Sequence, residues 1–253
     1  MRLERLVSWR EVRHWVDHTP PGLFTGISFD NYTWWIYNQG LFSGLIASFT
    51  NRTNLKILDW GCGMGKLAPV CSFFVKDGGK YLGIDTEIRA IEQCRKMYGD
   101  LRNCEFYLTK DQNAYYANPG VSKEMISQID WPVPNNSQDL LLASSVFTHL
   151  QEAESVKYME KIHQVLAPGG LAMLTFHIIR DYVNTNPTFN FTHQLTPGWF
   201  TSDRECPEHA IGITMDTLNG LIKGRFQVEK MFEGTSTGGS GPSFQDLFVF
   251  KKV

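Results

Sequence analysis

The segment Ile57-Leu58-Asp59-Trp60-Gly61-Cys62-Gly63-Met64-Gly65-Lys66 decides the fold of this protein. Its apolar beginning predicts a buried strand, its glycines allow a tight turn, and the residues that follow predict a helix. A turn of this kind presents the free amides of a helix N-terminus to a ligand. The pattern alone also fits a strand-to-helix turn that binds nothing. Residues before and after the turn are therefore needed to indicate whether a ligand binds there.

Two acidic residues indicate what such a ligand would be. Asp59 precedes the first glycine by two residues, where its carboxylate would repel a pyrophosphate and attract an ammonium group. The third glycine of a dinucleotide-binding turn would fall at Lys66 and is missing. Asp85 ends the next predicted strand, where a carboxylate can accept hydrogen bonds from both hydroxyls of a ribose. An unphosphorylated ribose together with an ammonium group describes S-adenosylmethionine.

Downstream of this turn, short apolar runs alternate with segments of helical spacing, which is typical of a parallel sheet covered on both faces. The Pro168-Gly169-Gly170 sequence predicts the stop of one of these helices. The fold class expected is α/β, a Rossmann-like doubly wound, mostly parallel seven-stranded sheet with a C-terminal antiparallel hairpin. The predicted strands are 56–60, 81–85, 104–109, 140–144, 171–177, 226–233 and 245–251, and the predicted helices are 66–76, 87–98 and 152–166.

Three segments interrupt the alternation. Residues 1–50 are rich in aromatic side chains and predict an N-terminal helical cap on a domain spanning 51–253. Residues 110–138 form a long polar excursion, and residues 178–212 read as irregular and are punctuated by prolines. Long loops inside a compact domain are usually functional, so we expect 178–212 to be a substrate lid.

Composition narrows the function further. The chain has 253 residues and a net charge of −2, without a basic stripe, which disfavours a nucleic-acid partner. Its five cysteines are odd in number and lack metal-ligand spacing, so we expect reduced thiols and no metal site. A charged N-terminus and the lack of a membrane-length apolar run predict a soluble, cytoplasmic protein without a membrane partner. Nothing in the sequence indicates the oligomeric state.

The glycine turn, together with Asp85, resembles the first motifs of class I S-adenosylmethionine-dependent methyltransferases. The turn at 166–170 resembles the one before their fifth strand. The resemblance covers about 55–177 and implies S-adenosylmethionine as cofactor, with S-adenosylhomocysteine as product. The residues that it implies for cofactor binding are Asp59, Gly61 and Gly63 around the methionine end, with Cys62 in the same turn, Asp85 at the ribose, Thr86 beside the adenosine, Asp111 or Gln112 at the adenine, and Ser144 and Ser145 beneath the sulfonium.

A narrower resemblance concerns the pathway. The segments 131–134, 137–139, 144–150 and 245–248 are similar to those of bacterial methyltransferases of glycan or secondary-metabolite pathways. Gln138 departs from that pattern, because those relatives usually carry an aromatic residue there.

Methyl transfer to oxygen benefits from a general base, and two histidines follow the predicted fourth and fifth strands. We expect His177 to be the better placed catalytic base and His149 the second candidate. Each also fits a structural histidine held by local hydrogen bonds. Among the N-terminal aromatic residues, Tyr32, Trp35 and Tyr37 are expected to contact substrate, although such a stripe also fits the core beneath a covering helix.

The sequence therefore predicts an enzyme that transfers the methyl group of S-adenosylmethionine to a small-molecule acceptor, a hydroxyl of a sugar or another metabolite. The alternatives are N- or C-methylation of a natural product, or a non-catalytic S-adenosylmethionine-binding subunit. An aminopropyltransferase is disfavoured because the predicted fourth strand does not end in a carboxylate. DNA methylation is disfavoured because its characteristic proline motifs are missing.

Overall fold

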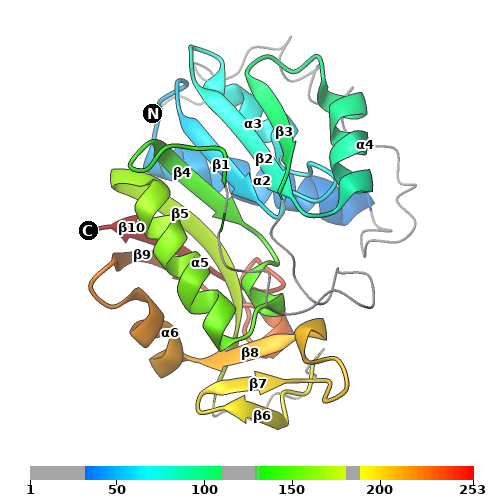
Figure 1. The fold of residues 1–253 in the computed structure, drawn as a ribbon, viewed down its shortest axis with the longest axis vertical. Coiled ribbons are helices and arrows are strands. Elements are labelled where there is room, and N and C mark those ends of the chain that lie inside the picture. Colours follow the sequence, from blue (N-terminus) through cyan, green and yellow to red (C-terminus); the bar gives the residue numbers. More distant parts are fainter. Residues whose placement is uncertain (1–31, 110–128, 130, 181–188) are drawn as a thin grey trace. The chain divides into compact units, whose positions relative to one another are not determined.

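The computed structural model describes residues 32–109, 129, 131–180 and 189–253 (Figure 1). The chain divides into two compact units, Met1–Leu108 and Thr109–Val253. This division falls after Leu108, whereas the sequence suggested a cap of residues 1–50 on a single larger domain. Each unit is described by itself below.

The first unit is built on three parallel strands, β1 (Lys56–Trp60), β2 (Lys80–Asp85) and β3 (Cys104–Leu108). β2 lies between the other two, pairing with β1 through Leu58 and Leu82 and with β3 through Ile84 and Tyr107. The first two strands are buried over almost their whole length. Continuous burial is expected of parallel strands that are covered on both faces.

Three helices accompany these strands, namely α2 (Tyr32–Phe49), α3 (Ala68–Val75) and α4 (Ile88–Tyr98) (Figure 1). α3 is apolar nearly all round and seven of its eight residues are buried, so it is a core helix. α4 is amphipathic, and Glu87 caps its N-terminus by accepting hydrogen bonds from the amides of Arg89 and Ala90.

The second unit is built around the long strand β5 (Leu166–Ile179), which has different neighbours along its length. β4 (Gln138–Ala143) pairs parallel with its first part. β10 (Asp246–Lys252) lies antiparallel on its other side, from Leu171 to Phe176, and pairs in turn with β9 (Phe226–Phe232). The C-terminal hairpin predicted from the sequence is thereby confirmed.

The last residues of β5 have a different neighbour. From His177 to Ile179, β5 pairs parallel with β8 (Ile211–Thr214). β8 pairs with β7 (Trp199–Thr201), which pairs with β6 (His193–Thr196), both in antiparallel fashion. The prediction that 178–212 is irregular was therefore wrong for the described part of that segment. Its strands are only three or four residues long and separated by turn formers, so they lack a readable alternation.

Helix α5 (Glu152–Val165) precedes β5 and packs against it, and α6 (Met215–Ile222) follows β8 (Figure 1). Pro168-Gly169-Gly170 was expected to stop the first of these helices. Instead α5 ends at Val165 and the strand begins at once, with Leu166 pairing with Gln138. Short 3-10 helices lie at Phe147–His149 (η3), Pro207–His209 (η4) and Thr235–Thr237 (η5).

All seven predicted strands are present, and those of the α/β alternation pair in parallel. The predicted fold class, mostly parallel α/β with a C-terminal antiparallel hairpin, is confirmed. β6, β7 and β8 are additions to it. Among the residues that the structure describes, no helix has both the length and the apolar character needed to cross a membrane.

Candidate functional site

The glycine turn is a compact loop between β1 and α3. The amides of Gly61 and Cys62 both donate to the carbonyl oxygen of Ile84, at 2.8 and 3.1 Å, which fastens the turn to the end of β2. Gly65 has a φ of +74°, and an added Cβ would lie 2.7 Å from the ring of Tyr98. Gly63 has a φ of +52°, and among the residues that the structure describes none has an atom within 4 Å of such a Cβ. Gly63 therefore borders open space, where a ligand can approach the backbone.

Asp85 connects this turn with the end of β2. One carboxylate oxygen accepts from the amide of Gly63 at 2.7 Å, and the other accepts from the amide of Glu87 at 2.9 Å. Burial raises the pKa of Asp85, and hydrogen bonds from the amides of Glu87, Gly63 and Thr86 oppose that rise. The side chain remains half-exposed. Since a carboxylate has about four lone-pair positions, Asp85 retains capacity for ribose hydroxyls.

Asp59 lies below the turn and is only 2% exposed. Its Oδ2 accepts from the hydroxyl of Tyr81 at 2.6 Å. Burial raises the pKa of Asp59 to about 7, while the Tyr81 hydrogen bond and the charge of Lys66 lower it. Burial lowers the pKa of Lys66 to about 8, although the Asp59 charge acts in the opposite direction. Burial therefore moves the pKa of Asp59 upward and that of Lys66 downward, while their opposite charges act against both shifts.

The role of Lys66 was not evident from the sequence, where it only marked a missing glycine. Its backbone is also held, because the side-chain amide of the buried Gln39 in α2 donates to the carbonyl oxygen of Lys66 at 2.8 Å. The signal for this contact in the sequence was a glutamine within an aromatic-rich helical segment, since a polar side chain that becomes buried needs a hydrogen-bond partner.

The predicted substrate residues of α2 have different environments. Trp35 is buried among core residues, which favours the covering-helix interpretation for this side chain. Tyr37 is exposed. Tyr32 begins the helix, and its side chain is outside the described part of the structure. Asp111 and Gln112, which were expected near the adenine, also lie outside the described residues.

In the second unit, Ser144 and Ser145 follow β4 and are half-exposed. Ser145 adopts a φ of 61°, which is rare for a residue other than glycine. Its amide donates to the hydroxyl of Thr175 at 2.7 Å, and its own hydroxyl donates to Oε1 of Gln245 at 3.0 Å. Thr175 donates to the same Gln245 oxygen at 2.6 Å. These bonds fix the unusual backbone at the end of β4, and such conformations often mark functional sites.

His149 ends η3, just beyond β4, and is half-exposed. Its Nδ1 lies 2.8 Å from the carbonyl oxygen of Glu208. Because a carbonyl oxygen can only accept, Nδ1 carries the proton, and the neutral ring therefore has its lone pair on Nε2. Burial lowers the pKa of His149, so the neutral form prevails near neutral pH.

His177, in the last part of β5, is only 2% exposed. Such burial leaves the imidazole of His177 little access to a substrate. Its Nδ1 lies 2.7 Å from the hydroxyl of Ser236 in η5, and phenylalanine rings surround the imidazole. Burial, followed by the nearby His149, lowers the pKa of His177 to about 3. A protonated imidazole cannot be accommodated there without a large cost.

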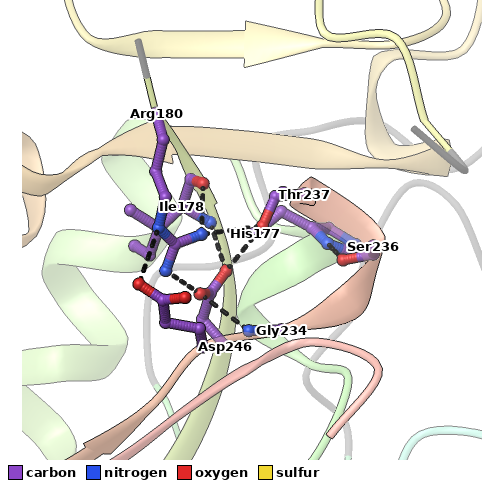
Figure 2. Close-up of polar contacts among 8 residues, drawn as sticks. His177, Ile178, Arg180, Gly234, Ser236, Thr237 and Asp246 are labelled. Atoms are coloured by element: carbon purple, nitrogen blue, oxygen red, sulfur yellow. Dashed lines mark hydrogen bonds and ion pairs between the residues drawn. The ribbon is translucent and has the colours of Figure 1, made fainter. Parts of the chain in front are cut away.

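Figure 2 shows a network of buried polar groups that holds the end of β5 next to η5. Asp246, the fully buried first residue of β10, accepts from the amides of Ile178 and Gly234 at 2.8 and 3.0 Å and forms an ion pair with Arg180. Arg180 also donates to Thr237, at 2.9 Å. The network fixes the turn that carries Ser236, the hydrogen-bond partner of His177. Sequence analysis missed it, although an aspartate that opens an apolar strand was a usable signal.

All five cysteines are free thiols in this structure. Among the described residues, no group of histidine, cysteine or acidic side chains has a geometry suited to a metal ion.

Comparisons with known proteins identify the domain. Residues 58–174 match a model of the methyltransferase domain. A crystal structure of a SAM-dependent methyltransferase from Aquifex aeolicus is similar, with 17% identity, coverage of 82% of this chain and 87% of that chain, and a TM-score of 0.52. A protein from Pyrococcus horikoshii OT3 has 15% identity, coverage of 87% and 91%, and a TM-score of 0.59. A Burkholderia thailandensis 1,6-didemethyltoxoflavin-N1-methyltransferase with bound S-adenosylhomocysteine has 14% identity, coverage of 85% and 78%, and a TM-score of 0.54.

Because the solved structures are only 14–17% identical to this chain, they show the fold alone. The methyltransferase activity is indicated by the match of residues 58–174 to the domain model. The class is that of Rossmann-like methyltransferases with the class I arrangement. Residues 58–174, just under half of the chain, therefore carry a methyltransferase domain, and the protein is a methyltransferase. The residues present fit S-adenosylmethionine, since the first unit offers an open glycine backbone at Gly63 and a carboxylate with remaining lone pairs for a ribose at Asp85.

Proposed function

We propose that the protein transfers the methyl group to a hydroxyl of a small-molecule acceptor, a sugar or another metabolite. The observation that carries this proposal is a neutral imidazole with a defined tautomer, His149, just beyond β4. β4 and β5 are parallel neighbours, so their carboxyl ends share one edge of the sheet, where such folds bind ligands.

On the cofactor side, S-adenosylmethionine supplies a methyl group that is already electrophilic. The protein's own residues therefore have to bind, orient and exclude water. We assign Asp59 to the ammonium group, Asp85 and Thr86 to the ribose, and Gly61, Cys62 and Gly63 to the close approach of the backbone. The assignment of Ser144 and Ser145 to the reacting end is supported by the strained, hydrogen-bonded backbone of Ser145.

On the acceptor side, the geometry supports His149 as general base better than His177. His149 is half-exposed, and its protonated Nδ1 donates to a carbonyl, which leaves Nε2 as the proton acceptor. His177 is almost fully buried, and its low pKa makes it a weak base. The sequence ranked these two histidines in the opposite order, and their roles remain predictions. We further propose that residues 1–50 and 178–212 select the acceptor, which the added strands β6 to β8 beside the end of β5 support.

The decisive variant is His149→Asn, because the asparagine amide can still donate to the carbonyl of Glu208 but offers no base. S-adenosylhomocysteine release on the acceptor found by screening sugars, phenols and amines should fall by roughly a hundredfold to ten-thousandfold. Binding of S-adenosylhomocysteine, measured by calorimetry, should be unchanged.

His177→Asn is the matched control, since asparagine can keep the hydrogen bond to Ser236. If His177→Asn abolishes turnover while His149→Asn does not, the base is His177. Full turnover in both variants would reject a histidine base and favour an amine or carbon acceptor. Binding of S-adenosylhomocysteine without release on any acceptor would identify a non-catalytic subunit.

A further inference from the structure

A group of aromatic rings in the second unit surrounds His177. We call Phe189, Phe191, Phe244 and His209 the aromatic cluster. The rings of Phe189 and Phe191 lie 5.2 and 5.3 Å from that of His177, and the ring of Phe244 lies 6.2 Å from it. Phe189 also contacts His209, at 6.1 Å and almost perpendicular. The cluster joins the segment before β6, the 3-10 helix η4 and the segment before β10.

The members of the aromatic cluster are not sealed into the core. Phe189, Phe191 and Phe244 are each half-exposed, and His209 is exposed, whereas His177 beneath them is buried. Phe189 and Phe244 contact the His177 ring edge-on, and the ring of Phe191 is tilted against it. Ring edges and faces arranged in this way recognise another aromatic ring by the same offset and edge-to-face geometry.

Among the described residues around the cluster, Arg180 has acidic partners and the carboxylate of Glu208 has a hydrogen-bond donor. Arg180 is neutralised by Asp246 and lies 3.8 Å from Glu233. The carboxylate of the buried Glu208 accepts from the side-chain amide of Gln151. Burial lowers the pKa of both His149 and His177, so neither imidazole is charged near neutral pH. A neutral ligand fits these surroundings better than a charged one.

We propose that the aromatic cluster is the acceptor-binding surface, and that the acceptor is a neutral, planar aromatic molecule whose phenolic hydroxyl is methylated. This inference rests on the proposed function and names its substrate class. His149 Nδ1 lies 2.8 Å from the carbonyl oxygen of Glu208, the residue before His209, and the ring of His209 contacts that of Phe189. A ring stacked on Phe189 would therefore bring its hydroxyl near His149.

The chemistry of the base agrees with this substrate class. The phenolic oxygen attacks the methyl carbon, the carbon–sulfur bond breaks with its electron pair remaining on sulfur, and the hydroxyl proton passes to Nε2 of His149. A phenol ionises near pH 10, whereas an alcohol ionises close to bulk water, at about 15.7. A half-exposed imidazole whose pKa is lowered, as that of His149 is, is better matched to the more acidic hydroxyl.

The test measures binding and does not require turnover. Saturation-transfer NMR is recorded with 2-naphthol and with methyl β-D-glucopyranoside, each in the presence and absence of S-adenosylhomocysteine. We expect naphthol to bind and the glucoside not to bind. Phe189→Leu and Phe191→Leu keep the apolar volume but remove the ring, and each should weaken naphthol binding by roughly two- to tenfold.

Phe232→Leu, a half-buried phenylalanine of β9 outside the aromatic cluster, is the matched control and should leave naphthol binding unchanged. Circular dichroism melts establish that each variant is folded. Failure of S-adenosylhomocysteine to bind would refute the proposed cofactor site. Naphthol binding measured without S-adenosylhomocysteine tests the aromatic cluster independently of that site. The inference is overturned if the glucoside binds and naphthol does not, or if naphthol binds equally well to wild type and both cluster variants.

Discussion

Asp59 lies below the glycine turn. Replacing it with asparagine should remove its contribution to the pH dependence of the free energy of unfolding. Asp59 is almost fully buried, and burial raises its pKa from 3.8 to about 7. Folding therefore favours the protonated acid. As pH rises from about 4 towards 7, the unfolded chain releases this proton while the folded protein retains it, so the free energy of unfolding decreases.

The magnitude follows from the shift. Each pKa unit corresponds to about 1.4 kcal/mol, so a rise from 3.8 to about 7 amounts to about 4 kcal/mol over the whole window. Between pH 5 and pH 7, the ionisation of Asp59 should lower the free energy of unfolding by about 2–3 kcal/mol. Asparagine is nearly isosteric, and its side-chain oxygen can still accept from the hydroxyl of Tyr81. The free energy of unfolding of the Asp59→Asn variant should therefore not show this decline.

Urea denaturation of wild type and Asp59→Asn at several pH values gives the difference between their free energies of unfolding. That difference should move in favour of the variant by about 2–3 kcal/mol between pH 5 and pH 7. Asp77→Asn, an exposed carboxylate of the same unit, should retain the wild-type slope. Parallel curves for wild type and Asp59→Asn would show that the acid is not held protonated by burial.

Two further predictions concern other acidic residues. Asp85→Ala should lose about 1.5–3 kcal/mol of S-adenosylhomocysteine affinity in calorimetry, the worth of hydrogen bonds to a charged group, and unchanged affinity in a folded variant would remove Asp85 from the ribose site. Asp246→Ala leaves Arg180 without its buried partner and should lower the free energy of unfolding by about 3–5 kcal/mol. Glu160→Ala is the control, because it breaks the surface pair with Arg225 and should lower the free energy of unfolding by at most about 1 kcal/mol. Equal losses for Asp246→Ala and Glu160→Ala in urea titrations would contradict the importance of burial for the Asp246–Arg180 pair.

Much of the cofactor site could be predicted from the sequence because its residues are local. The turn from Asp59 to Lys66 is one strand, one loop and one helix start, and its glycines are required by backbone angles that other residues rarely adopt. Asp85 could be found because it ends the following strand, and parallel strands bring their carboxyl ends to one edge of the sheet. Lys66 escaped notice because its altered pKa depends on burial beside Asp59, which the sequence does not display.

The acceptor side was harder to predict because it is assembled from distant segments. His149 was found from its place after a strand, but its tautomer depends on the carbonyl of Glu208, a contact across 59 positions of sequence. His177 is equally close to a strand end, yet its burial depends on Phe189, Phe191 and Phe244. No local pattern indicates which of two strand-end histidines will be covered by aromatic rings from elsewhere in the chain.

The sequence by itself determined the order of strands and helices, the glycine turn and the places of Asp59 and Asp85 at the ends of their strands, since these follow from periodicity and backbone conformation. Only the tertiary structure decided that residues after β5 form the strands β6 to β8, each too short to show a pattern of its own. It also decided the charge states of Asp59 and His177, because desolvation depends on everything packed around a side chain and not on its neighbours in sequence.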